Sequence, residues 1–359
     1  MHLRRLWLTD FRGYEEADVA FDAGLTAVVG PNGQGKTNLL EAIGYLATLG
    51  SFRGAPTEAL IRAGAERAIV RAEAEREGRE LLLEAELSSS GRNRTQLNRQ
   101  PLRRARDLLG ALRVTVFSPD DLTLVKGSPG ERRAYLDETL VALHPRHDQA
   151  RTDLDRILRQ RGALLKQAGG RLSAEVELTL DVFDAKLAAA GEVLGAARRE
   201  LVAELEPVLG EAYDRVARRS AEVRAVYRPP WMAEGLAAAL AAARKDDLRR
   251  GVSTVGPHRD ELELVLGGMP ARTHASQGEQ RSLALALRLA AHEVVTRRTE
   301  TPPVLLLDDV FSELDPDRSD ALLGSLPAGQ TVLSTATALP TGAVPGKVLR
   351  VAAGVVTEG

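Results

Sequence analysis

Short stretches in the first 120 residues alternate apolar and polar positions with a period of two. This is the period of a β-strand with one buried face. The strands predicted in this way cover residues 2–11, 17–21, 25–29, 66–75, 79–88 and 112–118. The fourth and fifth meet at Glu77-Gly78-Arg79, a hairpin signal. A segment with helical spacing, residues 37–49, follows the third strand, so the N-terminal part predicts a mixed α/β lobe.

Between about residues 126 and 250 the sequence becomes rich in alanine, leucine and arginine, and its apolar positions have helical spacing. Ser128-Pro129 predicts a helix start, because serine is a good N-cap and proline fits the first helical position. Proline and glycine punctuate the region, which favours several packed helices over one long coiled coil. The last hundred residues return to α/β, with predicted strands at 261–266, 302–310 and 331–336 and a helix at 276–298.

The string GPNGQGKT at residues 30–37 is a complete G-x-x-x-x-G-K-T phosphate loop, placed between a predicted strand and a predicted helix. The glycines free the backbone to turn its N–H groups toward a triphosphate, Lys36 reaches the β- and γ-phosphates, and the Thr37 hydroxyl can bind Mg²⁺. A glycine-rich turn with this string arises by chance in roughly one chain in a hundred of this size. The predicted nucleotide-binding residues are Gly30, Pro31, Asn32, Gly33, Gln34, Gly35, Lys36, Thr37 and Asn38.

A second candidate element is the apolar run 304–307, which ends in Asp308-Asp309. An aspartate at the end of a buried strand is common, but beside a phosphate loop it is placed to hold Mg²⁺ together with Thr37. Asp309 stands where many such ATPases carry a glutamate that polarises the attacking water. Aspartate is one methylene shorter, so we expect slow hydrolysis. The predicted catalytic residues are Lys36, Asp308 and Asp309.

Two further motifs accompany the loop in the order known from ABC ATPases. The string Ser276-Gln277-Gly278-Glu279-Gln280 resembles their signature motif, and Ser276 with Glu279 is also a capping box. The string Ser312-Glu313-Leu314-Asp315 stands at the place of their D-loop; the alternative is a turn that starts the next helix at Asp315-Pro316. The chain departs from the pattern twice: residues 335–337 lack the switch histidine, and residues 118–121 lack the Q-loop glutamine.

Composition limits the remaining choices. The chain has 359 residues, no cysteine and a net charge of −2, so global charge gives no argument for nucleic acid, and disulfides are excluded. No apolar run approaches the roughly 18 residues of a membrane span, and we expect a cytoplasmic protein. A stretch at residues 91–107 is rich in arginine, and either a solvated surface or a contact to phosphate backbones would explain it. These arginines are Arg92, Arg94, Arg99, Arg103, Arg104 and Arg106.

The opening residues 3–43 are similar to those of the SMC, Rad50 and RecF group of DNA-maintenance ATPases. SMC and Rad50 proteins carry several hundred residues of coiled coil, which the helical insert here is too short to form. Three strings, Phe117–Asp137, Ser253–Leu264 and Ser276–Ala290, resemble the RecF family, and the resemblance spans nearly the whole chain.

This resemblance implies an α/β fold: an ABC-type ATPase head with a phosphate-loop sheet lobe, a mainly helical second lobe and no long coiled coil. We expect residues 1–120 and 300–359 to form lobe I, and residues 121–299 to form lobe II, which ends in the signature helix. It also implies that Arg12, in the turn DFRGY, and Arg53, in SFRG, lie near the nucleotide; each could equally be a surface arginine.

The function that the resemblance implies is ATP-dependent DNA binding in recombinational repair and the SOS response. The protein would bind duplex or gapped DNA at gaps and stalled forks, hydrolyse ATP slowly with Mg²⁺, and work with RecR and RecO to help RecA load. In ABC geometry Ser276 and Gly278 of one copy contact the γ-phosphate held by Lys36 of another, so we expect an ATP-dependent homodimer.

Three alternatives remain from the residues alone. The ATPase subunit of a membrane transporter would need a membrane partner and normally the absent histidine and glutamine. A small-molecule kinase explains the phosphate loop but not the signature and D-loop strings. A structural SMC-like scaffold is disfavoured by the short helical insert. Binding of gapped duplex DNA, with and without ATP, separates these from the RecF-like function.

Overall fold

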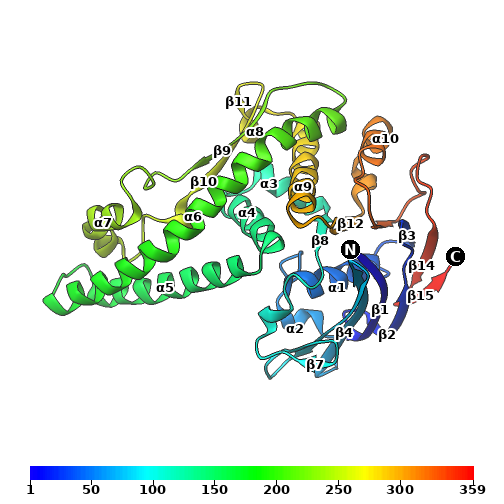
Figure 1. Cartoon of the computed structure of the whole chain (residues 1–359), viewed down its shortest axis with the longest axis horizontal. Coiled ribbons are helices and arrows are strands. Elements are labelled where there is room, and N and C mark those ends of the chain that lie inside the picture. The colour runs from blue at the N-terminus through cyan, green and yellow to red at the C-terminus, as the bar shows by residue number, and fades with distance from the viewer. The chain divides into compact units, whose positions relative to one another are not determined.

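The computed structural model describes residues 1–359, apart from the side chain of Glu313. The chain divides by packing into two units, and each is described by itself. Unit 1 comprises Met1–Leu122, Val208–Ala221 and Ser276–Gly359, and unit 2 comprises Thr123–Pro207 and Glu222–Ala275. Figure 1 colours these segments by residue number.

Unit 1 contains a six-stranded antiparallel sheet of order β2-β1-β4-β5-β6-β7. Its strands are β1 (His2–Phe11), β2 (Tyr14–Ala20), β4 (Arg67–Arg76), β5 (Arg79–Ser88), β6 (Arg94–Leu97) and β7 (Gln100–Pro101). The β4–β5 turn has positive φ at both Glu77 (52°) and Gly78 (75°), as the tight hairpin turns that match strand twist require. The predicted hairpin is confirmed.

The second sheet of unit 1 has the order β15-β14-β3-β13-β12-β8. Its strands are β3 (Leu25–Val29), β8 (Val114–Phe117), β12 (Val304–Asp308), β13 (Thr331–Thr335), β14 (Lys347–Ala352) and β15 (Val355–Glu358). All neighbours are parallel except the terminal hairpin β14–β15, which Figure 1 shows beside β3 at the C-terminus. Every residue of β12 is buried, which explains why this strand reads as a continuous apolar run.

Helices complete the core of unit 1. They are α1 (Lys36–Thr48), α2 (Thr57–Leu60), α9 (Gln277–Thr299) and α10 (Pro316–Gly324), with the short 3₁₀ turns η1 (Ala105–Leu108), η2 (Pro119–Asp121) and η4 (Val310–Glu313). The buried face of α1, including Leu39 and Ile43, shares one apolar cluster with β12 and β13 residues such as Leu306 and Val332. This burial holds the first turn of α1, and with it the phosphate loop, against the parallel sheet.

Unit 2 is mainly helical. Its elements are α3 (Leu122–Lys126), α4 (Pro129–Leu143), α5 (Arg146–Ala168), α6 (Ala174–Ala217), α7 (Leu236–Arg250), η3 (Pro257–Arg259) and α8 (Ala271–His274), with strands β9 (Val223–Arg228), β10 (Glu261–Leu266) and β11 (Met269–Pro270). The chain passes into unit 1 within α6, after Pro207. Ser128 caps α4 by accepting a hydrogen bond from the Gly130 N–H, so that predicted helix start is confirmed.

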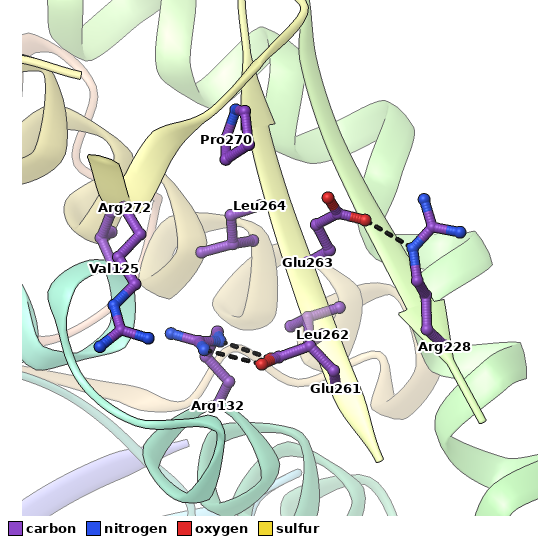
Figure 2. A pocket seen from close by; sticks show the side chains of 9 residues that line it. All are labelled: Val125, Arg132, Arg228, Glu261, Leu262, Glu263, Leu264, Pro270 and Arg272. Atoms are coloured by element: carbon purple, nitrogen blue, oxygen red, sulfur yellow. Dashed lines mark hydrogen bonds and ion pairs between the residues drawn. The ribbon is translucent and has the colours of Figure 1, made fainter. Parts of the chain in front are cut away.

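A pocket of about 490 Å³ in unit 2 lies along β10 (Figure 2). Its charged walls are largely paired with each other: Arg132 donates from Nε and Nη2 to Glu261 at 2.8 and 3.0 Å, and Arg228 donates to Glu263. The pocket therefore presents neutralised pairs beside apolar side chains, and it contains none of the predicted site residues.

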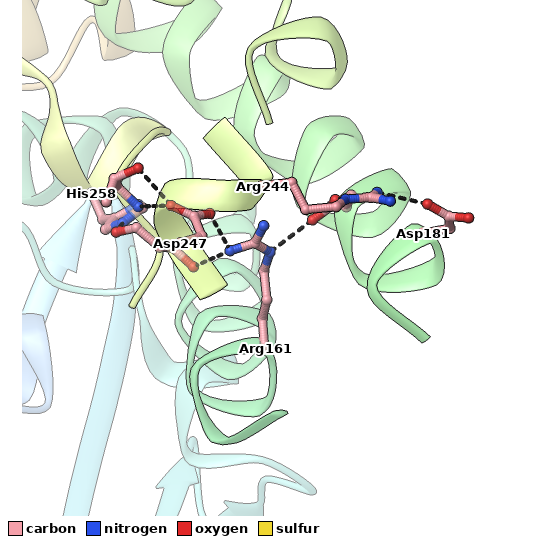
Figure 3. Close-up of polar contacts among 8 residues, drawn as sticks. Arg161, Asp181, Arg244, Asp247 and His258 are labelled. Carbon is pink, nitrogen blue, oxygen red and sulfur yellow. Dashed lines mark hydrogen bonds and ion pairs between the residues drawn. The ribbon is translucent and has the colours of Figure 1, made fainter. Parts of the chain in front are cut away.

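A buried arginine network joins three helices of unit 2 (Figure 3). Arg161 of α5 is fully buried and donates to Asp184 of α6 (2.7 Å), Asp247 of α7 (2.6 Å) and Ser253 (2.8 Å). Arg244 donates to Asp184 as well. A buried guanidinium is tolerated when carboxylates and hydroxyls satisfy it, so the network favours a packing of α5, α6 and α7 that keeps these partners around Arg161.

Two predictions differ from the structure. Strand β9 lies inside the region predicted to be helical. The sequence pattern missed it because the strand has only six residues and the segments on both sides have helical spacing. The prediction that residues 121–299 form lobe II also differs, because Val208–Ala221 and the signature helix, α9, belong to unit 1. There His292 Nδ1 lies 3.0 Å from Thr115 Oγ1 of β8, and the apolar face of α9 is buried. Sequence spacing shows that a helix has a buried face but not which sheet covers it.

The burial of His292 predicts acid sensitivity. Burial lowers the pKa of His292 from 6.5 to about 4. Between these pH values His292 is protonated in the unfolded chain but neutral in the folded chain. The free energy of unfolding therefore falls as the pH drops from 6.5 toward 4, by about 3 kcal/mol for this group. Denaturant unfolding across this range should show a shallower pH dependence for His292→Gln. The same substitution at the exposed His274 is the control, and an unchanged slope in His292→Gln would contradict the assignment.

Candidate nucleotide-binding site

The phosphate loop connects β3 to α1 and contains three glycines in the positive-φ region: Gly30 (156°), Gly33 (76°) and Gly35 (115°). A Cβ on Gly30 would lie 2.2 Å from the carbonyl oxygen of Val351, a distance that no side chain tolerates. The backbone therefore needs glycine here for both conformation and space. These constraints produce the tight turn that phosphate loops use.

Lys36 lies inside the loop that precedes it. Its side chain is largely buried, and Nζ donates to the carbonyl oxygens of Gly30 (2.8 Å) and Pro31 (2.9 Å). Burial lowers the pKa of Lys36, and the charges of Asp309 and Asp308 oppose that shift. A cation held at this place is positioned for an anionic ligand of the loop.

Thr37 and Asp308 meet although 271 residues separate them in sequence. The Thr37 hydroxyl donates to Asp308 Oδ1 at 2.8 Å, and the Ser334 hydroxyl of β13 donates to the same oxygen at 2.7 Å. Burial raises the pKa of Asp308, while the two hydrogen bonds and the charge of Arg53 oppose it. Ser334 was not predicted; its signal is a polar residue at the end of a buried strand next to β12.

Asp309 has an unusual backbone and an unsatisfied oxygen. Its φ of 49° places it in the left-handed region, and its N–H donates to the Ser334 carbonyl oxygen at 3.1 Å. Asp309 Oδ1 is buried and has no hydrogen-bond partner among the described residues. Backbone strain and an orphaned carboxylate oxygen are features that cluster at functional sites.

The oxygen atoms of Thr37 and Asp308 are of the hard type that Mg²⁺ prefers. Within the described residues no group of three or more His, Cys, Asp or Glu side chains could hold a metal alone. Mg²⁺ bound here would therefore take its remaining ligands from phosphate oxygens and water, as is usual for nucleotide-dependent sites.

The signature string caps α9. Ser276 Oγ accepts from the Glu279 N–H, and the Glu279 carboxylate accepts from the Ser276 N–H at 2.8 Å, so the predicted capping box is confirmed. Gln277 is exposed and Gln280 is buried. A Cβ on Gly278 would lie 2.5 Å from Arg318 Nη2.

The D-loop string lies next to the signature within unit 1. Asp315 caps α10 by accepting from the Arg318 N–H, and its other oxygen accepts from Arg318 Nη1 at 2.8 Å. Arg318 thus links Asp315 to the surface of Gly278. Ser312 Oγ donates to the carbonyl oxygen of Asp309, and Leu314 is half-buried. The predicted D-loop side chain of Glu313 lies outside the described residues.

The two segments that depart from the ABC pattern have other contacts. Asp121 accepts from Arg288 of α9 at 2.8 Å, which connects the end of β8 to the signature helix. Thr335 Oγ1 accepts from the Thr337 N–H at 3.2 Å, at the place of the usual switch histidine.

Arg12 is fixed by its neighbours. Its Nε and Nη2 donate to the two oxygens of Glu41, each at 2.8 Å, and Nη1 donates to the Ala59 carbonyl oxygen. Glu41 is fully buried in α1, so this pair ties the β1–β2 turn to the helix of the phosphate loop. A contact of Arg12 with the nucleotide remains a prediction. Arg53 is exposed, and its positive charge partly opposes the rise in the pKa of Asp308 that burial causes.

The arginine-rich stretch forms a hairpin, β6–β7, followed by η1. Five of its six arginines are exposed: Arg92, Arg94, Arg99, Arg103 and Arg104.

Within the described residues no helix is both long enough and apolar enough to cross a membrane.

Comparison with known proteins places these features in a family. The model described as the RecF/RecN/SMC N terminal domain matches residues 2–332. A DNA replication and repair protein RecF of Streptomyces avermitilis is 48% identical over 351 residues, covering 94% of this chain and 93% of the relative. One of Kineococcus radiotolerans is 47% identical with the same coverage.

Solved structures agree with the sequence relatives. A recombination mediator protein RecF of the RecFOR pathway, in complex with ATP, superposes with a TM-score of 0.91 at 27% identity, covering 100% of this chain and 97% of that chain. An Smc head domain of Pyrococcus furiosus has a TM-score of 0.58 at 18% identity, covering 100% and 96%, which shows the fold alone. The predicted fold class, an α/β ATPase head, is confirmed.

Proposed function

Because this chain belongs to the RecF family of DNA replication and repair proteins, we propose that it is an ATP-dependent DNA-binding protein of recombinational repair. The proposal rests on the hydrogen bond between the Thr37 hydroxyl and Asp308. It brings the phosphate loop, near one end of the chain, together with an acidic residue near the other end. We further propose that it acts on duplex or gapped DNA in the cytoplasm, with RecR and RecO as partners upstream of RecA.

In the proposed site the loop residues 30–38 and Lys36 bind the phosphates of ATP, and Thr37 and Asp308 hold Mg²⁺. The metal would neutralise charge that develops on the phosphate oxygens. Support comes from the glycine constraints of the loop and from the oxygen donors of Thr37 and Asp308. The RecF–ATP complex, similar over the whole chain, favours ATP over other nucleotides.

Asp309 is proposed to orient the attacking water through its unsatisfied carboxylate oxygen. Asp309→Asn should lower the rate of ATP hydrolysis at least tenfold, because general-base catalysis contributes 10²- to 10⁴-fold in typical enzymes. ATP affinity should change little, because the loop provides most phosphate contacts. Steady-state hydrolysis and equilibrium ATP binding measure the two effects, and unchanged turnover would remove the role.

The exposed signature residues Ser276 and Gln277 support the proposal of an ATP-dependent homodimer. A second copy would bring Ser276 and Gly278 to the γ-phosphate bound at Lys36, and the two-fold relation would close two sites at once. Hydrolysis would then weaken the dimer, because the γ-phosphate distinguishes the two states.

Sedimentation should show a monomer without nucleotide and a dimer with ATP. Ser276→Arg should abolish the dimer, because a bulky cation would occupy the contact, and it should leave ATP binding by the monomer intact. Ser128→Arg is the matched control, since Ser128 is also an exposed helix-capping serine, in unit 2. A dimer that survives Ser276→Arg, or one that forms equally with ADP, contradicts the proposal.

The exposed arginines of the β6–β7 hairpin are proposed to contact DNA phosphates. Such contacts make affinity fall with salt, with a slope of log K against log salt of about 0.9 per phosphate. Replacing Arg94, Arg99 and Arg103 by serine should flatten the slope by about 2 to 3. The control replaces three exposed arginines of unit 2 that pair with nearby carboxylates: Arg151, Arg156 and Arg249.

The salt slope is measured with gapped duplex DNA in the presence of ATP. An equal change in both triple variants would show a general charge effect and contradict a contact at the hairpin. The same titration with Lys36→Arg tests the ATP dependence, because this variant should bind DNA as the wild-type protein does without nucleotide.

A further inference from the structure

The phosphate loop is held from outside by two donors that come from distant parts of unit 1. The carbonyl oxygen of Gln34 accepts from the Gly354 N–H at 3.3 Å, in the turn between β14 and β15. The next carbonyl oxygen, that of Gly35, accepts from the Tyr14 hydroxyl at 2.9 Å, and it also accepts from the Leu39 N–H of α1 at 3.0 Å. Two consecutive main-chain carbonyls of the loop therefore have partners far along the chain: Gly354 lies 320 residues after Gln34 (354 − 34), and Tyr14 lies 21 residues before Gly35.

The hairpin turn also holds the Gln34 side chain. Its Oε1 accepts from the Ala353 N–H at 2.6 Å, so the side chain and the main chain of Gln34 bind adjacent N–H groups of one turn. Gln34, predicted as a nucleotide-binding residue, therefore directs its amide oxygen to the hairpin. At the other end of the loop, Gly30 packs against the carbonyl oxygen of Val351 in β14.

The orientation of these carbonyls decides where the N–H groups point. In a planar trans peptide the C=O and N–H bonds point in opposite directions. Holding the Gln34 carbonyl at the hairpin therefore aims the Gly35 N–H away from the hairpin, and holding the Gly35 carbonyl at Tyr14 aims the Lys36 N–H away from Tyr14. Phosphate loops bind their anion through such consecutive N–H groups.

The supports are themselves well fixed. Tyr14 is fully buried at the start of β2, and a Cβ on Gly35 would lie 3.0 Å from its hydroxyl oxygen. The turn Ala353-Gly354 has φ of 50° and 75°, and a Cβ on Gly354 would lie 2.5 Å from the Gly13 carbonyl oxygen. The turn is therefore packed between the loop and the β1–β2 turn with no room for a side chain at Gly354.

We propose that the C-terminal hairpin turn and the Tyr14 hydroxyl are positioning elements that preorganise the phosphate loop for nucleotide. The proposal rests on the proposed function, since it assigns these residues to the same ATP site. Tyr14, Ala353 and Gly354 act through the loop and not on the nucleotide. In a preorganised loop the N–H groups are already ordered before the nucleotide binds, so binding costs less conformational entropy. Loss of a support therefore weakens nucleotide binding.

The first test is Tyr14→Phe, which removes only the hydroxyl. The Kd values for Mg-ATP and Mg-ADP, measured by calorimetry, should both rise about fivefold, the effect of one hydrogen bond. Both nucleotides should be affected because both carry the phosphates that the loop N–H groups bind. In steady-state hydrolysis KM should rise by a similar factor while kcat stays near the wild-type value.

The second test is Gly354→Ala, with Gly78→Ala as the matched control. Gly78 occupies the same position of the β4–β5 turn, with the same φ of 75°, but its Cβ would meet nothing within 4 Å. Both variants suffer the same backbone strain, and only Gly354→Ala pushes the turn away from Gly13 and the loop. Nucleotide affinity should fall in Gly354→Ala and stay unchanged in Gly78→Ala, with thermal unfolding as the check that both fold.

Wild-type Kd values for Tyr14→Phe and Gly354→Ala would overturn the inference while leaving ATP binding itself intact. A loss confined to ATP, with normal ADP binding, would also overturn it, because the effect would then lie at the γ-phosphate. A wild-type protein that binds neither nucleotide would instead refute the proposed function, and the inference with it.

Discussion

The hydrogen bonds that meet at Asp308 Oδ1 are the constraint on which the proposed ATP site depends. Thr37, at the start of α1, and Ser334, at the end of β13, both donate to this single oxygen. The three residues come together because β3, β12 and β13 are parallel, and parallel strands present their carboxyl ends at one edge of the sheet. A loop that follows β3 and an acid that ends β12 are therefore neighbours, whatever length of chain separates them.

Further polar contacts connect this edge of the sheet with other parts of unit 1. The backbone of Asp309 is tied to Ser334, and Ser312 of the D-loop is tied to Asp309. Arg318 then connects Asp315 with the surface of Gly278, while Asp121 and Arg288 connect the end of β8 with the same signature helix. These contacts form a series of polar links between Asp308 and the residues around Gly278, all within unit 1.

Unit 2 combines apolar packing with buried ion pairs. One of its apolar clusters contains Leu165, Leu180 and Leu248. Arg161 binds Asp184 and Asp247, and Arg198 binds both oxygens of Asp137 at 2.8 Å. Removal of one partner of such a pair leaves a buried charge uncompensated and is therefore strongly destabilising.

The amino-acid sequence by itself determined the local elements and the chemistry of the loop. The GPNGQGKT string, the apolar run before Asp308 and the Ser276–Glu279 capping box are local patterns, because backbone conformation and periodic burial act over a few residues. Only the tertiary structure decided that α9 packs in unit 1, that β9 is a strand, that Arg12 is bound by Glu41, and that Ser334, Tyr14 and Gly354 support the site. These contacts join residues 21 to 320 positions apart through strand order and close packing, and no short window of sequence carries that information.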